Sequence, residues 1–245
     1  MVILELDTWD PVILPDATNF SNIKICRLRN AILHVYSEDL KQHFFSNVLV
    51  LEELELTDCQ WSKSDQLIID FGSCDYILHH FGSLVDAEID FKRFDIPLPQ
   101  EKDPTATKAL KELSNVKRLK ISGETFQISF SKDKTLLSFL RISPNLKTII
   151  IAKGFVGHQY STDSGWTPDM VPQCVLLHLK SVEFCEFYGC LEELNAVKTI
   201  LKNARVLRRM VIKFPLLFST DKQNKVMKKL LKFSRSSKSC IIEIS

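Results

Sequence analysis

A spaced triplet of apolar residues returns along almost the whole chain and restricts what the chain can fold into. Its members stand at positions one, four and six of a short segment, as Leu51, Leu54 and Leu56 do. Further copies follow at intervals of about 30 residues. They are Ile23/Cys26/Leu28, Leu84/Ala87/Ile89, Val116/Leu119/Ile121, Leu146/Ile149/Ile151, Leu179/Val182/Phe184 and Leu207/Met210/Ile212, with partial copies at Leu4/Leu6 and Ile242/Ile244. So regular a series indicates a stack of similar units.

The spacing predicts that each unit contributes one strand to a parallel sheet. Positions four and six lie on the same face of a strand because side chains alternate with a period of two. Position one reaches the same core from the turn before the strand, and stacked units bury faces that none could bury alone. The interval is at or slightly above the upper end of the leucine-rich-repeat range. We therefore predict an α/β fold, a leucine-rich-repeat solenoid with parallel strands inside and helices and irregular turns outside.

The stretches between the predicted strands include helical patterns and two loops. Periodic apolar residues and capping residues predict helices at 37–46, 104–113, 134–140, 191–202 and 221–233. The segment 92–103 contains two prolines among charges, and 153–173 is rich in glycine and proline, so both are predicted to be loops. The second loop is the predicted boundary within the chain. Residues 66–70 are a candidate extra strand.

Composition excludes several classes of protein. The chain has 45% hydrophobic and 25% charged residues and a net charge of +2, so charge alone predicts no nucleic-acid partner. No apolar run approaches the roughly 18 residues that span a bilayer, and the amino terminus does not resemble a signal peptide. We expect no membrane association and a cytoplasmic or nuclear protein. The seven cysteines are odd in number and scattered, which predicts reduced thiols that pack as small hydrophobic residues.

Particular residues also carry a resemblance to a plant family. The last third resembles the FBD domain found at the carboxyl terminus of many plant F-box proteins, through the segments 166–168, 171–174, 179–184, 189–194, 197–207 and 239–242. Earlier segments, at 13–15, 50–59 and 113–119, resemble the leucine-rich repeats that precede that domain. The resemblance implies a leucine-rich-repeat region over 1–153, a linker loop over 154–173 and an FBD domain over 174–245. The FBD region would continue or cap the stack.

The resemblance also implies a function. Members of the family usually begin with an F-box, which docks on the Skp-type adaptor of a cullin ubiquitin ligase. Leu14-Pro15-Asp16 superficially resembles an F-box opening but leads into a strand, so we expect no F-box here and a chain that is truncated upstream. The implied role is non-catalytic substrate binding for an SCF-type E3 ubiquitin ligase, with an unknown protein as substrate. Adaptor and cullin are expected partners only if an upstream F-box exists.

Two other functions stay open at this point. One is a stand-alone interaction protein with no ligase role, which a missing F-box would allow. The other is a receptor for a small ligand, which needs convergent polar and aromatic residues. The predicted inner face offers almost no aromatic residues, so this second alternative is disfavoured.

Charged residues between the core positions are the candidate binding site. They would face outward on the concave side of the solenoid, where such proteins usually bind. An acidic patch flanked by basic strands would select a basic segment of a partner. Alternatively, opposite charges pair across the ladder and contribute about 0.2–1 kcal/mol each. The candidates are Arg27, Arg29, Glu53, Glu55, Asp86, Glu88, Asp90, Arg118 and Lys120.

Other polar groups are weaker candidates. Lysines at 225, 228, 229 and 232 suggest either phosphate binding or a solvated helix face, and the second is favoured because the opposite face is apolar. Cys74, His79 and His80 lack the four ligands of a zinc site, so we predict no metal and no cofactor. Motifs of hydrolases, nucleotide-binding enzymes and metalloproteases are missing from the sequence, and we predict that the protein is not an enzyme.

Overall fold

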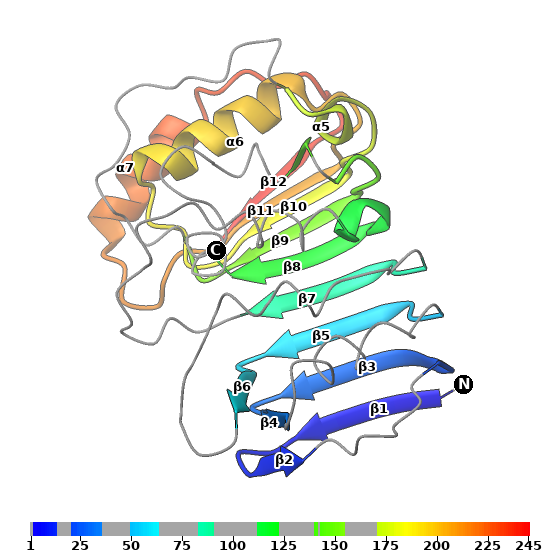
Figure 1. Cartoon of the computed structure of the whole chain (residues 1–245). Coiled ribbons are helices and arrows are strands. Elements are labelled where there is room, and N and C mark those ends of the chain that lie inside the picture. The colour runs from blue at the N-terminus through cyan, green and yellow to red at the C-terminus, as the bar shows by residue number, and fades with distance from the viewer. Residues whose placement is uncertain are drawn as a thin grey trace, which may run out of the picture.

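A nine-stranded parallel sheet organises the structure (Figure 1). The computed structural model describes residues 2–13, 21–35, 50–63, 83–90, 112–122, 140–141, 143–154 and 171–245. The strands follow one another in the sheet in chain order. They are β1 (Val2–Asp7), β3 (Ile23–Arg29), β5 (Glu53–Thr57), β7 (Asp86–Asp90), β8 (Arg118–Ser122), β9 (Thr148–Ala152), β10 (Ser181–Phe184), β11 (Arg209–Ile212) and β12 (Ile241–Ile244). The predicted α/β class and parallel strands are confirmed.

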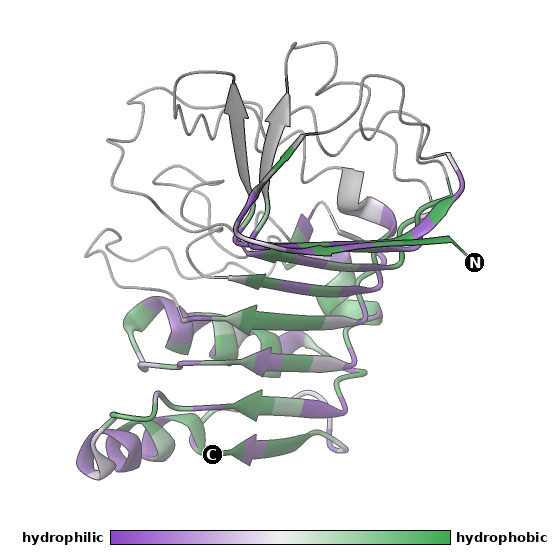
Figure 2. Ribbon diagram, turned by 90° about the horizontal axis from the view of Figure 1, so that it is seen from below, coloured by the Kyte–Doolittle hydropathy of each residue, from purple (hydrophilic) through white to green (hydrophobic). Residues whose placement is uncertain are grey.

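The register of these strands aligns the repeat positions in two continuous rows. Position four forms a row in which Leu54 lies beside Cys26, and position six forms a row in which Leu56 lies beside Leu28. The same correspondence holds from β1 to β12. Leu28, Leu54, Leu119 and Ile149 are fully buried, whereas most of the alternate residues are half-buried or exposed; Asp90, Ser122 and Val211 are the buried exceptions on these strands. Figure 2 shows this alternation as green and purple segments along the strands.

Backbone hydrogen bonds before the strands repeat as regularly as the side chains. The amides of Lys147 and Thr148 both donate to the carbonyl of Lys117, at 2.8 and 3.0 Å. Lys180 and Ser181 bind Lys147 in the same way, at 2.8 and 3.1 Å. Position two of each repeat therefore lies directly beside position two of the next. The position-one side chains that follow from this arrangement, such as Leu146 and Leu179, are fully buried.

A turn with a left-handed residue ends several of the strands. Position eight has a positive φ at Asn30, Asp58, Lys153 and Glu186, between 53° and 55°. Asn and Asp tolerate this conformation better than most residues, whereas Lys and Glu are less usual there. After the turns in the first part of the chain, a second, three-stranded parallel sheet forms from β2 (Pro11–Ile13), β4 (Ile32–Val35) and β6 (Gln60–Lys63). The apolar pattern of the sequence did not predict this sheet.

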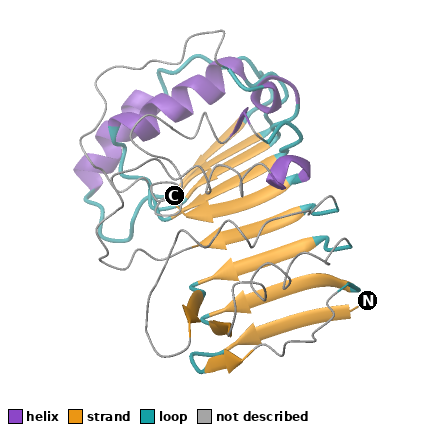
Figure 3. Ribbon diagram, in the orientation of Figure 1, coloured by secondary structure: helices purple, strands orange, loops and turns teal. Residues whose placement is uncertain are grey.

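The helices lie over one face of the large sheet at its carboxyl-terminal end (Figures 1 and 3). They are α5 (Gln173–Leu177), α6 (Leu191–Asn203) and α7 (Thr220–Leu230), and a 3-10 turn, η2, covers Glu112–Asn115. The helix predicted at 191–202 is confirmed. The helix predicted at 221–233 exists, but it begins after Ser219 and ends at Leu230. Within the described residues, no helix is long and apolar enough to cross a membrane.

Other predicted elements cannot be compared with the structure. The helices at 37–46, 104–113 and 134–140 lie wholly or almost wholly outside the described residues. The same holds for the loop at 92–103, the candidate strand at 66–70 and most of the linker at 154–173.

Side chains from α6 complete the core beneath the last strands. Leu194, Val197, Ile200 and Leu201 are buried in the same cluster as the strand residues. Leu191, the first residue of the helix, is 58% exposed. Apolar contact with the sheet therefore begins one turn into α6.

A row of aromatic rings continues the core past β10 and β11. Phe184 meets Phe187 edge to face, with ring centroids 5.6 Å apart, and Phe187 meets Phe214 at 6.4 Å. Phe214 then stacks on Phe218 at 5.5 Å. These contacts fix the loop before α7 against the carboxyl ends of the strands.

Replacing Ile149 by Ala should remove a fully buried side chain from the position-four row. We expect the free energy of unfolding to fall by about 2–5 kcal/mol, since a cavity forms where the sheet cannot collapse. Ile150→Ala is the matched control because Ile150 is half-buried on the opposite face of the same strand. Chemical denaturation of both variants measures the difference, and equal losses would contradict the assigned register.

Candidate functional site

The candidate residues lie together on the face of the large sheet opposite α6 and α7. We call this surface the ion-pair face, and it is built from positions three, five and seven of the repeats. Along it, β1 carries acids, β3 arginines, β5 and β7 acids, and β8 basic residues. All nine residues predicted for the binding site are found here, on β3, β5, β7 and β8.

On β3 the two arginines pair with acids of both neighbouring strands. Arg27 binds Glu53, with Nη2 and Oε1 2.6 Å apart. Arg29 donates to Glu55 through two nitrogens, Nη2 at 2.7 Å, and to Glu5 through Nη1 at 3.0 Å. The hydrogen bonds that the two arginines donate to these carboxylates raise the pKa of both guanidinium groups. Arg29 thus links β1, β3 and β5 across the surface.

A second set of pairs joins β7 to the strands that follow it. Asp86 lies 3.4 Å from Nε of Arg118, and Glu88 accepts a hydrogen bond from Lys120. Asp90 is 8% exposed and pairs at 2.6 Å with Lys153. Lys153 was not among the predicted site residues because it follows β9 at position eight, one residue past the strand. The structure distinguishes Lys153 by the left-handed turn that this residue occupies.

A seam of like charge separates the two sets of pairs. Glu53 lies directly opposite Asp86, and Glu55 lies opposite Glu88. Like charges in facing positions destabilise a sheet. Here the acids of β5 bind cations on the β3 side, and those of β7 bind cations on the β8 side or beyond. The ion pairs therefore offset the repulsion between the facing acids of β5 and β7.

Pairing leaves much of this surface open to solvent. The side chains of Arg118, Lys120 and Asp86 are 67%, 41% and 38% exposed, whereas Glu55 is 14% exposed. Cross-strand pairing, the alternative to partner binding, is thus present in the structure. Pairing and binding are compatible, and the binding role of the nine residues stays a prediction.

Further ion pairs cover the carboxyl-terminal strands. Lys213 pairs with Glu183 at 2.7 Å, and Arg209 forms a two-point contact with Glu243, at 2.7 and 2.9 Å. Hydrogen bonding from Arg209 lowers the pKa of Glu243. This pair therefore stabilises the fold above the ordinary pKa of a glutamate and is lost as the pH falls through the lowered value.

The described thiols are poorly suited to nucleophilic chemistry. Burial raises the pKa of Cys26, Cys174 and Cys190 to about 12 and that of Cys59 to about 11. A thiol reacts as its thiolate, which these groups scarcely form at neutral pH. Within the described ranges, no group of three or more His, Cys, Asp or Glu could hold a metal ion. The weak candidates Cys74, His79 and His80 lie outside those ranges.

The lysines of α7 occupy the solvent side of that helix. Lys225, Lys228 and Lys229 are exposed, whereas Val226 and Leu230 are buried against the rest of the protein. This arrangement is the one expected for a solvated helix face. Phosphate binding by these lysines stays an untested alternative.

The segment after β10 packs closely against α6 and α7, and we call this contact the junction. The buried carboxylate of Glu193 accepts hydrogen bonds from the amides of Gly189 and Cys190, at 2.6 and 3.1 Å, and so caps α6. Gly189 has a φ of 72°, and a Cβ there would lie 2.4 Å from Val226 on α7. Only glycine fits both the conformation and the space. Gly189 and Glu193 both belong to the segment 189–194 that resembles the FBD domain, but the buried role of Glu193 was not predicted from the sequence.

Part of the chain is similar to a known protein family. Residues 167–212, which include α5, β10, α6 and β11, match the FBD family model. These residues are therefore similar to an FBD domain, and we call them the FBD region. The junction at Gly189 and Glu193 lies inside that region, and the Val226 contact joins it to α7.

Three relatives from Arabidopsis thaliana illustrate the similarity. A putative F-box/FBD/LRR-repeat protein is 37% identical over 109 residues, which are 43% of this chain and 24% of the relative. An F-box/FBD/LRR-repeat protein is 32% identical over 107 residues, again 43% and 24%. An FBD-associated F-box protein is 29% identical over 155 residues, 63% of this chain and 28% of the relative. The resemblance to this plant family is confirmed, and the matches span about a quarter of each relative's length.

Gly189→Ala should destabilise the FBD region, because it forces a methyl group against Val226 and an unfavourable φ on alanine. We expect a loss of about 1–3 kcal/mol in the free energy of unfolding. Gly189→Ala should cost less when it is added to Val226→Ala than when it is made in the native protein. The smaller alanine side chain at position 226 relieves the steric contact, whereas the unfavourable φ at residue 189 remains. Urea denaturation of the two single variants and the double variant measures this coupling. Strict additivity would contradict the assigned contact.

Exchanging the charges of one pair tests the seam. In the double variant Asp86→Arg/Arg118→Asp the ion pair is kept, and an arginine replaces the acid opposite Glu53. We expect the free energy of unfolding to be unchanged or raised by up to about 1 kcal/mol. Arg118→Asp alone leaves Asp86 facing another acid and should lower the free energy of unfolding. The loss should be smaller than about 1 kcal/mol because both side chains are exposed to solvent. A double variant less stable than Arg118→Asp would refute this account of the seam.

Proposed function

We propose that this protein is a non-catalytic recognition module, the substrate-binding part of an F-box subunit in an SCF-type E3 ubiquitin ligase. The match of residues 167–212 to the FBD family carries the proposal, because the similar Arabidopsis proteins are named as F-box proteins with FBD and leucine-rich repeats. In this role the protein contributes binding energy and another subunit performs the chemistry. The proposal places its action in the cytoplasm or nucleus.

A leucine-rich-repeat solenoid is the architecture we propose for the whole chain. The rows at positions one, four and six support it, and so does position nine of the repeat that begins at Leu51, because the repeat pattern carries Asn or Cys there. Cys59 occupies position nine, and its thiol donates to the carbonyl of Leu28 in the preceding repeat, at 3.1 Å. Strands β10, β11 and β12 extend the sheet in the same register. This continuity supports an FBD domain over 174–245 that follows the repeats of 1–153 and the linker of 154–173.

The ion-pair face is the surface that we propose for substrate binding. From β1 to β8 its carboxylates outnumber its cations, even with Lys153 included. The seam keeps acids of β5 and β7 side by side although a different choice of residues would avoid the repulsion. A partner segment rich in Lys or Arg would relieve that repulsion on binding. Recognition of a basic segment would therefore explain why acids face each other in the seam, which the stability of the fold does not explain.

The test is affinity capture from plant cells of the chain alone and of the chain joined behind an F-box. We expect the Skp-type adaptor only with the joined form and the same protein substrate with both forms. Conjugation of ubiquitin to that substrate should rise only with the joined form. The matched control carries both exchanges, Asp86→Arg/Arg118→Asp and Glu88→Lys/Lys120→Glu, and should keep the adaptor while losing the substrate.

Each other outcome points elsewhere. If neither form recovers the adaptor, or if a captured substrate gains no ubiquitin, a stand-alone interaction protein becomes the better explanation. Equal capture of substrate by the exchanged variant would remove the ion-pair face from the proposal and leave the ligase role intact.

A further inference from the structure

A line of basic side chains runs along the edge of the large sheet where its later strands begin. Position two is basic in four successive repeats, at Lys117, Lys147, Lys180 and Arg208, and we call these four residues the basic edge. Each is exposed. The backbone carbonyl of each of the first three accepts a hydrogen bond, at 2.8 Å, from the amide of the next. Regular parallel pairing therefore spaces the four residues about 4.8 Å apart over about 14 Å.

The charge of the basic edge is not balanced by pairing. Across the described ranges, none of the four side chains lies within ion-pair distance of a carboxylate. Earlier repeats differ, because position two is Lys24 and Glu52 there and the two bind each other at 2.7 Å. At the other end, the 235–239 loop lies beside Leu201 and Leu207 through the amide of Ser236 and the hydroxyl of Ser237. That loop adds the exposed Arg235 and Lys238.

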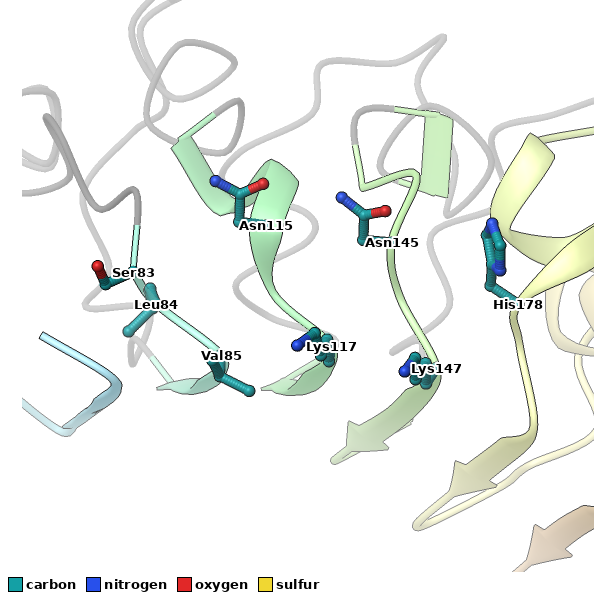
Figure 4. A pocket seen from close by; sticks show the side chains of 8 residues that line it. All are labelled: Ser83, Leu84, Val85, Asn115, Lys117, Asn145, Lys147 and His178. Atoms are coloured by element: carbon teal, nitrogen blue, oxygen red, sulfur yellow. The ribbon is translucent and has the colours of Figure 1, made fainter.

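A depression of about 520 Å³ borders the first half of the basic edge. Asn115 and Asn145 occupy equivalent places before β8 and β9, and His178 takes the corresponding place before β10 (Figure 4). The Asn145 side chain is held by a hydrogen bond from its amide nitrogen to the carbonyl of Ser114, at 3.3 Å. Amide and imidazole groups thus stand in a second line next to Lys117 and Lys147.

We infer that the basic edge binds an extended acidic segment of a protein partner. An extended chain advances about 3.4 Å per residue, so the four cations span about four residues. The side-chain oxygen of Asn145, whose amide nitrogen binds Ser114, suits the N–H groups of a peptide backbone. A single-stranded nucleic acid would instead require a row of aromatic side chains for stacking, whereas His178 is the one aromatic ring among the residues that line the depression or form the basic edge.

This surface is separate from the ion-pair face and carries the opposite charge. The inference shares with the proposed function only the premise that the protein recognises other proteins. Direct binding to a peptide needs neither an F-box nor an adaptor, so its failure would leave the ligase test unaffected.

The experiment measures fluorescence anisotropy of a labelled peptide with eight consecutive Asp and Glu residues, titrated with the full chain. We expect saturable binding that weakens with salt, and none with the peptide in which Asn and Gln replace the acids. Lys147→Glu/Lys180→Glu should raise the Kd at least tenfold. Lys225→Glu/Lys229→Glu makes the same change of charge on α7 and should alter the Kd less than twofold. Circular dichroism melting checks that both variants fold.

Two results would overturn the inference. Equal weakening by the two double variants would mean that the peptide responds only to net charge. Binding of an oligothymidylate of the same charge, without binding of the acidic peptide, would assign the basic edge to nucleic acid.

Discussion

The in-register stacking of apolar side chains between neighbouring parallel strands holds this structure together. Each strand from β3 to β11 of the large sheet buries two residues, at positions four and six, against the same positions of the strands beside it. Removing apolar surface from water contributes roughly 25 cal/mol per Å², and the effect is largest where the rows are continuous. Helices α6 and α7, the aromatic row and the turns all depend on a sheet that these contacts have aligned. The charged surfaces follow from the same register, since it fixes which side chains face each other.

Electrostatics in this protein is organised by strand rather than by local sequence. Because the register is constant, a residue at position five meets position five of the next repeat about 30 residues away. Glu55 therefore faces Arg27 on one side and Glu88 on the other. The face combines attraction and repulsion in adjacent columns, and its net effect on folding is small. Such a surface is available for binding because the core, and not the ion pairs, supplies the stability.

The sequence predicted the parts of the fold that follow a periodic rule. Positions one, four and six, the parallel order of the strands and helix α6 could all be found because burial repeats with a fixed spacing. The second sheet could not, since β2, β4 and β6 form after left-handed turns such as those at Asn30 and Asp58, which the apolar pattern does not encode. Helix α5 could not be predicted either, because it is a short helix without a side-chain cap and so leaves no periodic pattern.

The candidate site shows the same division. The nine charged residues could be placed on one face from alternation alone, but their pairing depends on the reach of each side chain. Lys153 binds Asp90 from the far side of β8. The basic edge was missed because position two belongs neither to the apolar triplet nor to the strand face. Glu193 was missed because a buried carboxylate becomes plausible only when the amides of Gly189 and Cys190 are in position to bind it.

The separation between buried and outward positions also has an evolutionary consequence. Each strand pairs only with the strands directly beside it in the large sheet, so a substitution of an outward residue at position two, three or five changes the surface and leaves the apolar rows intact. Duplication or loss of a whole repeat likewise preserves the rows on either side. A gene family built on this plan can therefore diversify what its members bind, by exchanging surface columns and altering their number, while selection on the core stays constant.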